Sequence, residues 1–185
     1  LPDGGLAVAA GDAVDLFDAQ AVVAGGSPHA SLNASGIVNS FIALPDGGLA
    51  ARREGGVDLF DKQAVAGGGS PHAFLNVTDA VLPNGPLAVL PDGGLAVAAG
   101  DAVDLFDAQA VVAGGSPHAS LNASGIVNSF IALPDGGLAA RREGGVDLFD
   151  KQAVAGGGSP HAFLNVTDAV LPNGPLAVLP DGGLA

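Results

Sequence analysis

The fold is decided by residues 41–61, which read FIALPDGGLAARREGGVDLFD. A β-branched and aromatic run at residues 37–43 leads into this stretch and is typical of a strand on a pleated, half-buried surface. The Pro-Asp-Gly-Gly run at 45–48 predicts a tight turn, because Pro presets φ and Gly accepts a positive φ. A second strand is expected to start at residues 49–51, and after a Glu-Gly-Gly break residues 57–61 form a third.

The rest of this unit predicts a weaker fourth strand and a longer connection. We expect the strand at residues 63–66, where Gln-Ala-Val-Ala precedes three glycines, and Ser70-Pro71-His72 then lead to the next first strand. No segment keeps a 3.6-residue apolar stripe for three turns, so helices are not expected. Four short strands joined by tight turns therefore predict an up-and-down antiparallel sheet.

The same unit recurs along the whole chain of 185 residues. Residues 1–89 are repeated without substitution at 90–178, and 179–185 begin a third copy. Within each copy the heptad LPDGGLA recurs at spacings of 43 and 46 residues. We therefore expect one repeat domain with an overhang at 179–185. Its units are 1–43, 44–89, 90–132 and 133–178. A perfect repeat of this length indicates either very recent duplication or deliberate design from a two-blade template.

Repeated sheets of this size favour an all-β fold, a β-propeller of four-stranded antiparallel blades. A single sheet cannot bury both faces, whereas sheets repeated around an axis pack against one another. Residues 41–49 and 57–61 resemble a kelch-type blade, with its apolar strand, Pro-Asp-Gly turn and aromatic-aspartate pair. They also resemble WD-type blades, with Phe17 and Phe60 where those blades have tryptophan. The resemblance covers nearly the whole chain and implies a propeller module.

Closure of the ring is the question that the repeat raises. Four copies of the third strand predict four blades per chain, and a last strand at 175–178 would lie beside residues 6–10. However, 179–185 duplicate 1–7, so the two segments compete for one position. Three arrangements fit: a four-blade ring with one frayed heptad, a window cut from a longer array, and an eight-blade ring of two chains. We favour the homodimer, since four blades are the small extreme for propellers.

The composition excludes several classes of function. The formal net charge is −13, and such a surface repels nucleic acid and anionic lipid, so we expect neither as a partner. The apolar stretches fall far short of the ~20 residues of a membrane helix. Cysteine is absent, which removes disulfides and thiolate metal sites. We expect no cofactor and no metal.

Two sets of residues are candidate binding sites, and each also has a plain structural interpretation. One histidine in each unit follows a Ser-Pro pair. A ring of histidine side chains can chelate a metal or respond to pH. The favoured role, however, is structural: the histidine connects a loop to a neighbouring strand by hydrogen bonds. Two Arg-Arg pairs in alternate units can bind an anion or carboxylate, but local pairing with Asp is favoured. The candidates are His29, His72, His118, His161, Arg52, Arg53, Arg141 and Arg142.

Paired carboxylates such as Asp15 with Asp18 recur in all four units. On a strand, positions three apart point to opposite faces, so strand ends and turn caps explain these residues better than a shared cation does. Symmetric repeats also lack the unique constellation of nucleophile, base and orienting group that catalysis needs, so an enzyme resembling the kelch-containing oxidases is the weakest interpretation. We predict a non-enzymatic scaffold or protein-interaction module. The alternative is a lectin-like module with equivalent sites for protein or carbohydrate.

Overall fold

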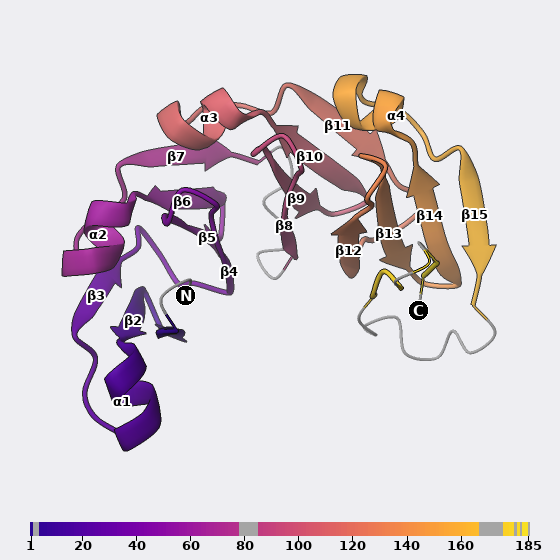
Figure 1. Ribbon diagram of the computed structural model, residues 1–185. Coiled ribbons are helices and arrows are strands. Elements are labelled where there is room, and N and C mark those ends of the chain that lie inside the picture. The colour runs from indigo at the N-terminus through magenta and orange to yellow at the C-terminus, as the bar shows by residue number, and fades with distance from the viewer. Residues whose placement is uncertain (2–3, 78–84, 167–175, 180, 182, 185) are drawn as a thin grey trace.

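Four antiparallel sheets follow one another along the chain in the computed structural model (Figure 1). The structure describes all residues except 2–3, 78–84, 167–175, 180, 182 and 185. Within these described residues, three sheets have four strands and the first has three, each built from strands adjacent in sequence. We call the sheets blade 1 (residues 6–33), blade 2 (40–76), blade 3 (87–122) and blade 4 (129–165).

The elements recur in the same order in each blade. Blade 1 contains β1 (Leu6–Ala10), β2 (Ala13–Phe17), α1 (Ala19–Ala24) and β3 (Ala30–Asn33). Blade 2 contains β4 (Ser40–Ala43), β5 (Leu49–Arg53), β6 (Gly56–Phe60), α2 (Lys62–Gly67) and β7 (Ala73–Asn76). Blade 3 contains β8 (Leu87–Val89), β9 (Leu95–Ala99), β10 (Ala102–Phe106), α3 (Ala108–Ala113) and β11 (Ala119–Asn122). Blade 4 contains β12 (Ser129–Ala132), β13 (Leu138–Arg142), β14 (Gly145–Phe149), α4 (Lys151–Gly156) and β15 (Ala162–Asn165).

The blades form an arch, as Figure 1 shows. Strands β8 and β12 lie on its concave side, and α2, α3 and α4 lie on its convex side. Blades 1 and 4 stand apart at the two ends, so the described part of the chain is an open arc of propeller blades. The predicted all-β blade architecture is confirmed.

The fourth strand predicted at residues 63–66 is wrong, because this segment is the short helix α2. The side chain of Asp61 accepts hydrogen bonds from the backbone N–H groups of Gln63 and Ala64 and so caps the helix. The true fourth strand is β7, which follows Ser70-Pro71-His72 and pairs with β6. A helix of six residues is too short to display a helical period, which explains the error.

The predicted turn is present at each LPDGGLA heptad in blades 2, 3 and 4. In blade 2 the Leu44 N–H donates to the Gly48 carbonyl at 2.9 Å, and the Gly47 N–H donates back to the Leu44 carbonyl at 3.0 Å. The Asp46 carboxylate accepts the Gly48 N–H at 2.9 Å. Gly47 has φ of 90°, a conformation that favours glycine. The turn therefore fixes the hairpin between the first and second strands of each of these blades.

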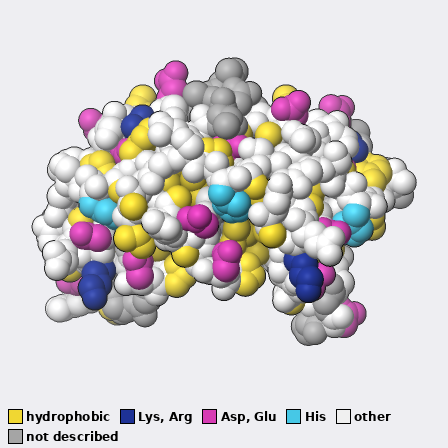
Figure 2. Space-filling view, turned by 90° about the horizontal axis from the view of Figure 1, so that it is seen from above, with side chains coloured by type: hydrophobic (Ala, Val, Ile, Leu, Met, Phe, Trp, Pro, Cys, Tyr) yellow, Lys and Arg dark blue, Asp and Glu magenta, His cyan; other side chains and the backbone are white. Residues whose placement is uncertain are grey.

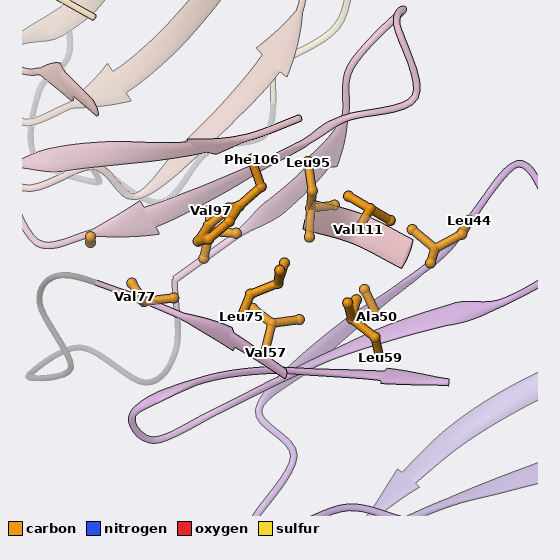
Figure 3. Packing of buried hydrophobic residues seen from close by; sticks show 11 residues of the cluster. Leu44, Ala50, Val57, Leu59, Leu75, Val77, Leu95, Val97, Phe106 and Val111 are labelled. Atoms are coloured by element: carbon orange, nitrogen blue, oxygen red, sulfur yellow. The ribbon is translucent and has the colours of Figure 1, made fainter. Parts of the chain in front are cut away.

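Neighbouring blades bury apolar side chains between them. Between blades 2 and 3, Val57 and Leu75 face Leu95, Val97 and Phe106, and all five are fully buried (Figure 3). A Leu, Val or Phe that is fully buried contributes about 1.5–3 kcal/mol relative to an exposed one. Similar clusters lie between blades 1 and 2 and between blades 3 and 4. The core of this protein thus consists of the layers between blades.

A backbone contact joins each blade to the next at the convex side. Between blades 2 and 3, the Asn76 N–H donates to the Gly115 carbonyl at 2.8 Å, and the Gly115 N–H donates to the Phe74 carbonyl at 2.9 Å. Gly115 has φ of 143°, which L side chains rarely adopt. Gly69 and Gly158 make the same contact at the other two joints. The glycines that follow α2, α3 and α4 therefore pair with the last strand of the preceding blade.

Two glycines of blade 2 should respond oppositely to alanine. At Gly56 a Cβ would overlap the Leu75 carbonyl oxygen and the Phe74 ring, so Gly56→Ala should lower the free energy of unfolding by about 1–3 kcal/mol. At Gly67, which ends α2, a Cβ meets nothing within 4 Å, and Gly67→Ala should be neutral or stabilising by up to about 1 kcal/mol. Chemical denaturation measures both, and equal stabilities would contradict this packing.

Candidate functional site

The Arg53 side chain lies in a cluster at the end of the β5–β6 hairpin. Its Nε donates to the Asp58 carboxylate at 3.0 Å, and its guanidinium carbon lies 4.4 Å from the centre of the Phe74 ring. Asp58 is only 1% exposed, so solvent screens this ion pair weakly. The same cluster recurs 89 residues later with Arg142, Asp147 and Phe163, at 3.1 Å and 4.3 Å. The predicted local pairing of arginine with aspartate is confirmed for Arg53 and Arg142.

Asp58 also joins two blades. Its second carboxylate oxygen accepts the backbone N–H of Ser35, in the loop after blade 1, at 2.6 Å. Between blades 3 and 4, the Ser124 N–H donates to Asp147 Oδ2 at 2.7 Å, and this same oxygen also accepts the Arg142 Nε. The carboxylate is therefore used on both sides, toward its own hairpin and toward the preceding blade. This arrangement makes Asp58 a structural link.

Arg52 points to the opposite side of the strand from Arg53, as neighbouring residues on a strand do. It is fully buried and donates from Nη2 to the Ala98 carbonyl of blade 3 at 3.2 Å. Its copy Arg141 is half-buried in blade 4. The predicted Arg-Arg site is thus divided, with Arg53 toward blade 1 and Arg52 toward blade 3.

Two equivalent surface hollows contain the partly exposed arginines. Each lies between the loop after an odd-numbered blade and the β-hairpin of the next blade, and combines an arginine and a glutamate with an exposed isoleucine. The first is lined by Ser35, Gly36, Ile37, Asn39, Arg53 and Glu54, and the second by Ser124, Gly125, Ile126, Asn128, Arg142 and Glu143. Ile37 is 68% exposed and Ile126 is 56% exposed. A hollow of this kind offers hydrogen-bond donors and acceptors beside one apolar side chain.

The histidines lie apart from one another at the surface. Each backbone N–H donates to the strand that precedes the helix in its own blade, as between His72 and the Leu59 carbonyl at 2.9 Å. The His72 Nε2 also lies 3.1 Å from the Val112 carbonyl of blade 3. Figure 2 shows the histidine side chains as separate spots, with acidic side chains scattered between them. The equivalent histidines are His29, His118 and His161. Among the described residues, no three His, Asp or Glu side chains are grouped to hold a metal ion.

The second carboxylate of each Asp pair caps a helix, as the strand-end interpretation predicted. Asp18, Asp61, Asp107 and Asp150 are the N-caps of the four helices. The first carboxylates lie on the strand before the helix: Asp15 accepts the Ser31 hydroxyl at 2.6 Å and Asp104 accepts the Ser120 hydroxyl at 2.7 Å. The two members of a pair therefore serve separate contacts.

The cluster of arginine, aspartate and phenylalanine was not anticipated, although the sequence carries a signal for it. The two units that have an arginine at this position, Arg53 or Arg142, also have a phenylalanine, Phe74 or Phe163. The other two units have alanine in place of the arginine and serine, Ser31 or Ser120, in place of the phenylalanine. The two positions change together because their side chains touch across the sheet. Comparing the alternate units for paired differences identifies the contact.

Removal of the Asp58 carboxylate should destabilise the fold strongly. Asp58→Ala leaves both the Arg53 guanidinium and the Ser35 N–H without this acceptor, and breaking such a buried pair costs about 3 kcal/mol. Asp12→Ala, at an exposed turn, should change stability by less than about 0.5 kcal/mol. Thermal and denaturant unfolding compare the two variants. A small effect of Asp58→Ala would show that the carboxylate is not a structural link.

In the described part of the chain, no helix has both the length and the apolar character needed to cross a membrane. No family model and no curated protein matches the sequence. Among solved structures, the chain is similar to a chain in the crystal structure of a mitotic checkpoint complex, with a TM-score of 0.68 and 18% identity. The match covers 95% of this chain and 53% of the other, so the protein spans about half the length of that neighbour. The likeness shows the fold, which is propeller-like.

Proposed function

We propose that the chain is a non-enzymatic β-propeller scaffold that acts as a protein-interaction module, with blades of kelch-like or WD-like type. The observation that carries the proposal is that, of the four buried charged side chains among the described residues, Arg52, Asp58 and Asp147 each bond to a neighbouring blade, while Asp104 accepts the Ser120 hydroxyl of its own blade. Their charges thus serve assembly of the blades. The fold neighbour comes from a multi-protein complex, which supports protein partners in general.

One partner is a second copy of the chain, in a two-chain ring of eight blades. The support is the apolar surface at the two ends of the arch, where Leu6 is 49% exposed and Leu164 is 41% exposed. Apolar side chains clustered at an end face mark an interaction surface more often than isolated ones do. The perfect repeat, from recent duplication or design, gives blades 1 and 4 the same residues as the internal blades 3 and 2, which pack against each other.

The mass of the chain in solution tests this self-association. Light scattering or native mass spectrometry at micromolar concentration should give twice 17.7 kDa. The reason is that closure buries apolar area at two joints at once. A mass of 17.7 kDa at all concentrations would exclude the two-chain ring.

The second candidate function is a lectin-like module that binds a ligand at equivalent sites. It is favoured by the two hollows that contain Arg53 and Arg142, which have the same lining residues 89 positions apart. A partly exposed guanidinium beside an amide and an isoleucine suits a carbohydrate or a peptide with acceptor groups.

A glycan array followed by calorimetry tests this second candidate. A ligand should bind with two equivalent sites per chain, and Asn39→Ala with Asn128→Ala should weaken it about tenfold by removing one amide from each hollow. Gln63→Ala with Gln152→Ala, on exposed helix positions, is the matched control. A failure to find any saturable ligand would leave the scaffold proposal as the better account.

A further inference from the structure

The two ends of the arch expose side chains whose identical copies are buried inside it. In blade 1, Leu6 is 49% exposed and Val8 is 42% exposed, whereas their copies Leu95 and Val97 in blade 3 are 0% exposed. Blades 1 and 3 have the same sequence over these strands. The difference in exposure therefore reflects only what lies against each blade.

The opposite end shows the same difference. In blade 4, Leu164 is 41% exposed, whereas its copy Leu75 in blade 2 is 0% exposed. The whole of β15 is exposed, while in β7 Leu75 is buried and Ala73 and Phe74 are half-buried. Blade 4 thus presents the face that blade 2 turns toward blade 3.

The partners of the buried copies identify what fits the exposed faces. Leu75 of blade 2 packs in one cluster with Leu95 and Val97 of blade 3 (Figure 3). Since blade 2 is the copy of blade 4 and blade 3 is the copy of blade 1, the exposed face of blade 4 is complementary to the exposed face of blade 1. Each contact between blades 2 and 3 therefore predicts a contact between the ends. Its residue numbers follow by adding 89 to the blade 2 residue, which gives blade 4, and subtracting 89 from the blade 3 residue, which gives blade 1.

We propose that blade 4 of one copy docks on blade 1 of a second copy through the contacts that join blade 2 to blade 3. This inference rests on the proposed self-association and specifies its interface. The hydrogen bonds of Gly115 with Asn76 and Phe74 predict that Gly26 bonds Asn165 and Phe163 of the other copy. Such a contact joins unlike faces, so the proposal includes a rotation between copies at which two identical joints close a ring of two chains.

The joint also adds a strand to the sheet of blade 1, in which the described residues form three paired strands. In blade 3 the corresponding position beside the second strand is occupied by β8, whose Ala88 pairs with Ala96. The copy of β8 is the segment 176–178 beyond blade 4. The shift of 89 residues therefore pairs Ala177 of one copy with Ala7 of the other.

The heptad at 179–185 competes with this pairing. In the structure Val178 forms a bridge with Leu184, and the Leu179 N–H donates to the Gly183 carbonyl at 2.7 Å, as in the internal turns. The equivalent pairing inside the chain is Val89 with Leu95. When the joint forms, Val178 changes its pairing partner from Leu184 of its own chain to Leu6 of the second copy, and both partners are leucines. The strand pairing is nearly unchanged, and burial of the apolar faces favours the exchange.

A designed disulfide tests the joint, since the chain has no cysteine of its own. Ala7→Cys with Ala177→Cys should oxidise to a covalent dimer on a non-reducing gel, because paired residues on adjacent antiparallel strands lie within disulfide reach. Ala88→Cys with Ala96→Cys, the same pair inside blade 3, should oxidise within one chain. An intrachain link between residues 7 and 177 would overturn the proposal in favour of a four-blade monomer. Two free thiols in the oxidised sample would also overturn it.

End-face variants test whether unlike faces meet. Leu6→Asp and Leu164→Asp should each give a single-chain mass, and a mixture of the two should regain a two-chain species, because each variant retains one intact face. Ile126→Asp, at a residue 56% exposed away from the ends, should retain the two-chain mass. Melting temperatures near that of the unchanged chain establish that the variants fold. A two-chain mass for either end variant alone would overturn the joint.

The two proposals fail in different ways. If the unchanged chain has a single-chain mass, self-association itself is wrong. If the unchanged chain and each end variant alone have the two-chain mass, the chain associates through another surface. If the unchanged chain has the two-chain mass but the end variants stay single-chain both alone and mixed, the end faces do not meet as blade 4 on blade 1. A mass above two chains would overturn the closed ring, since it indicates an open array of the same joints.

Discussion

The joint between neighbouring blades is the contact on which the rest of the structure depends. A four-stranded sheet of this size has two faces and can bury neither alone, so its apolar residues are stable only when another blade covers them. Val57 and Leu75 are buried because blade 3 lies on them, and the glycine contact at the convex side fixes how the blades meet. Hairpin turns and helix caps shape each blade, but the arch follows from the joints.

Two kinds of joint alternate along the chain, and this alternation explains why the repeat is 89 residues long. From an odd-numbered blade to the next, an aspartate accepts a backbone N–H across the joint, as Asp58 does from Ser35. From blade 2 to blade 3, Arg52 donates to Ala98 and His72 lies against Val112. All joints share the apolar layer and the glycine contact, while the polar links differ. A single blade is therefore an incomplete description of the repeating unit.

The parts of the fold that could be predicted from sequence are those that depend on local chemistry. The Pro-Asp-Gly-Gly turn and the strands on either side of it follow from the preferences of their own residues. The fourth strand did not, because residues 73–76 carry no stronger strand signal than 63–66, and pairing with β6 decides between them. The two roles of Arg52 and Arg53 were also hidden, since they depend on which blade lies on each side of one strand.

A perfect repeat has a physical consequence that a drifted repeat does not. Every internal joint is made by two unlike blade faces. Because the copies are identical, the first blade exposes one of these two faces and the last blade exposes the other. Complementarity between the ends is thus inherited from the interior and needs no separate optimisation. The net charge of −13 on each copy acts against contact between copies. At physiological salt, ions screen this repulsion between exposed charges that lie more than about 8–10 Å apart. The same acidity disfavours non-specific contacts equally, so only faces as well matched as those of blades 2 and 3 overcome it.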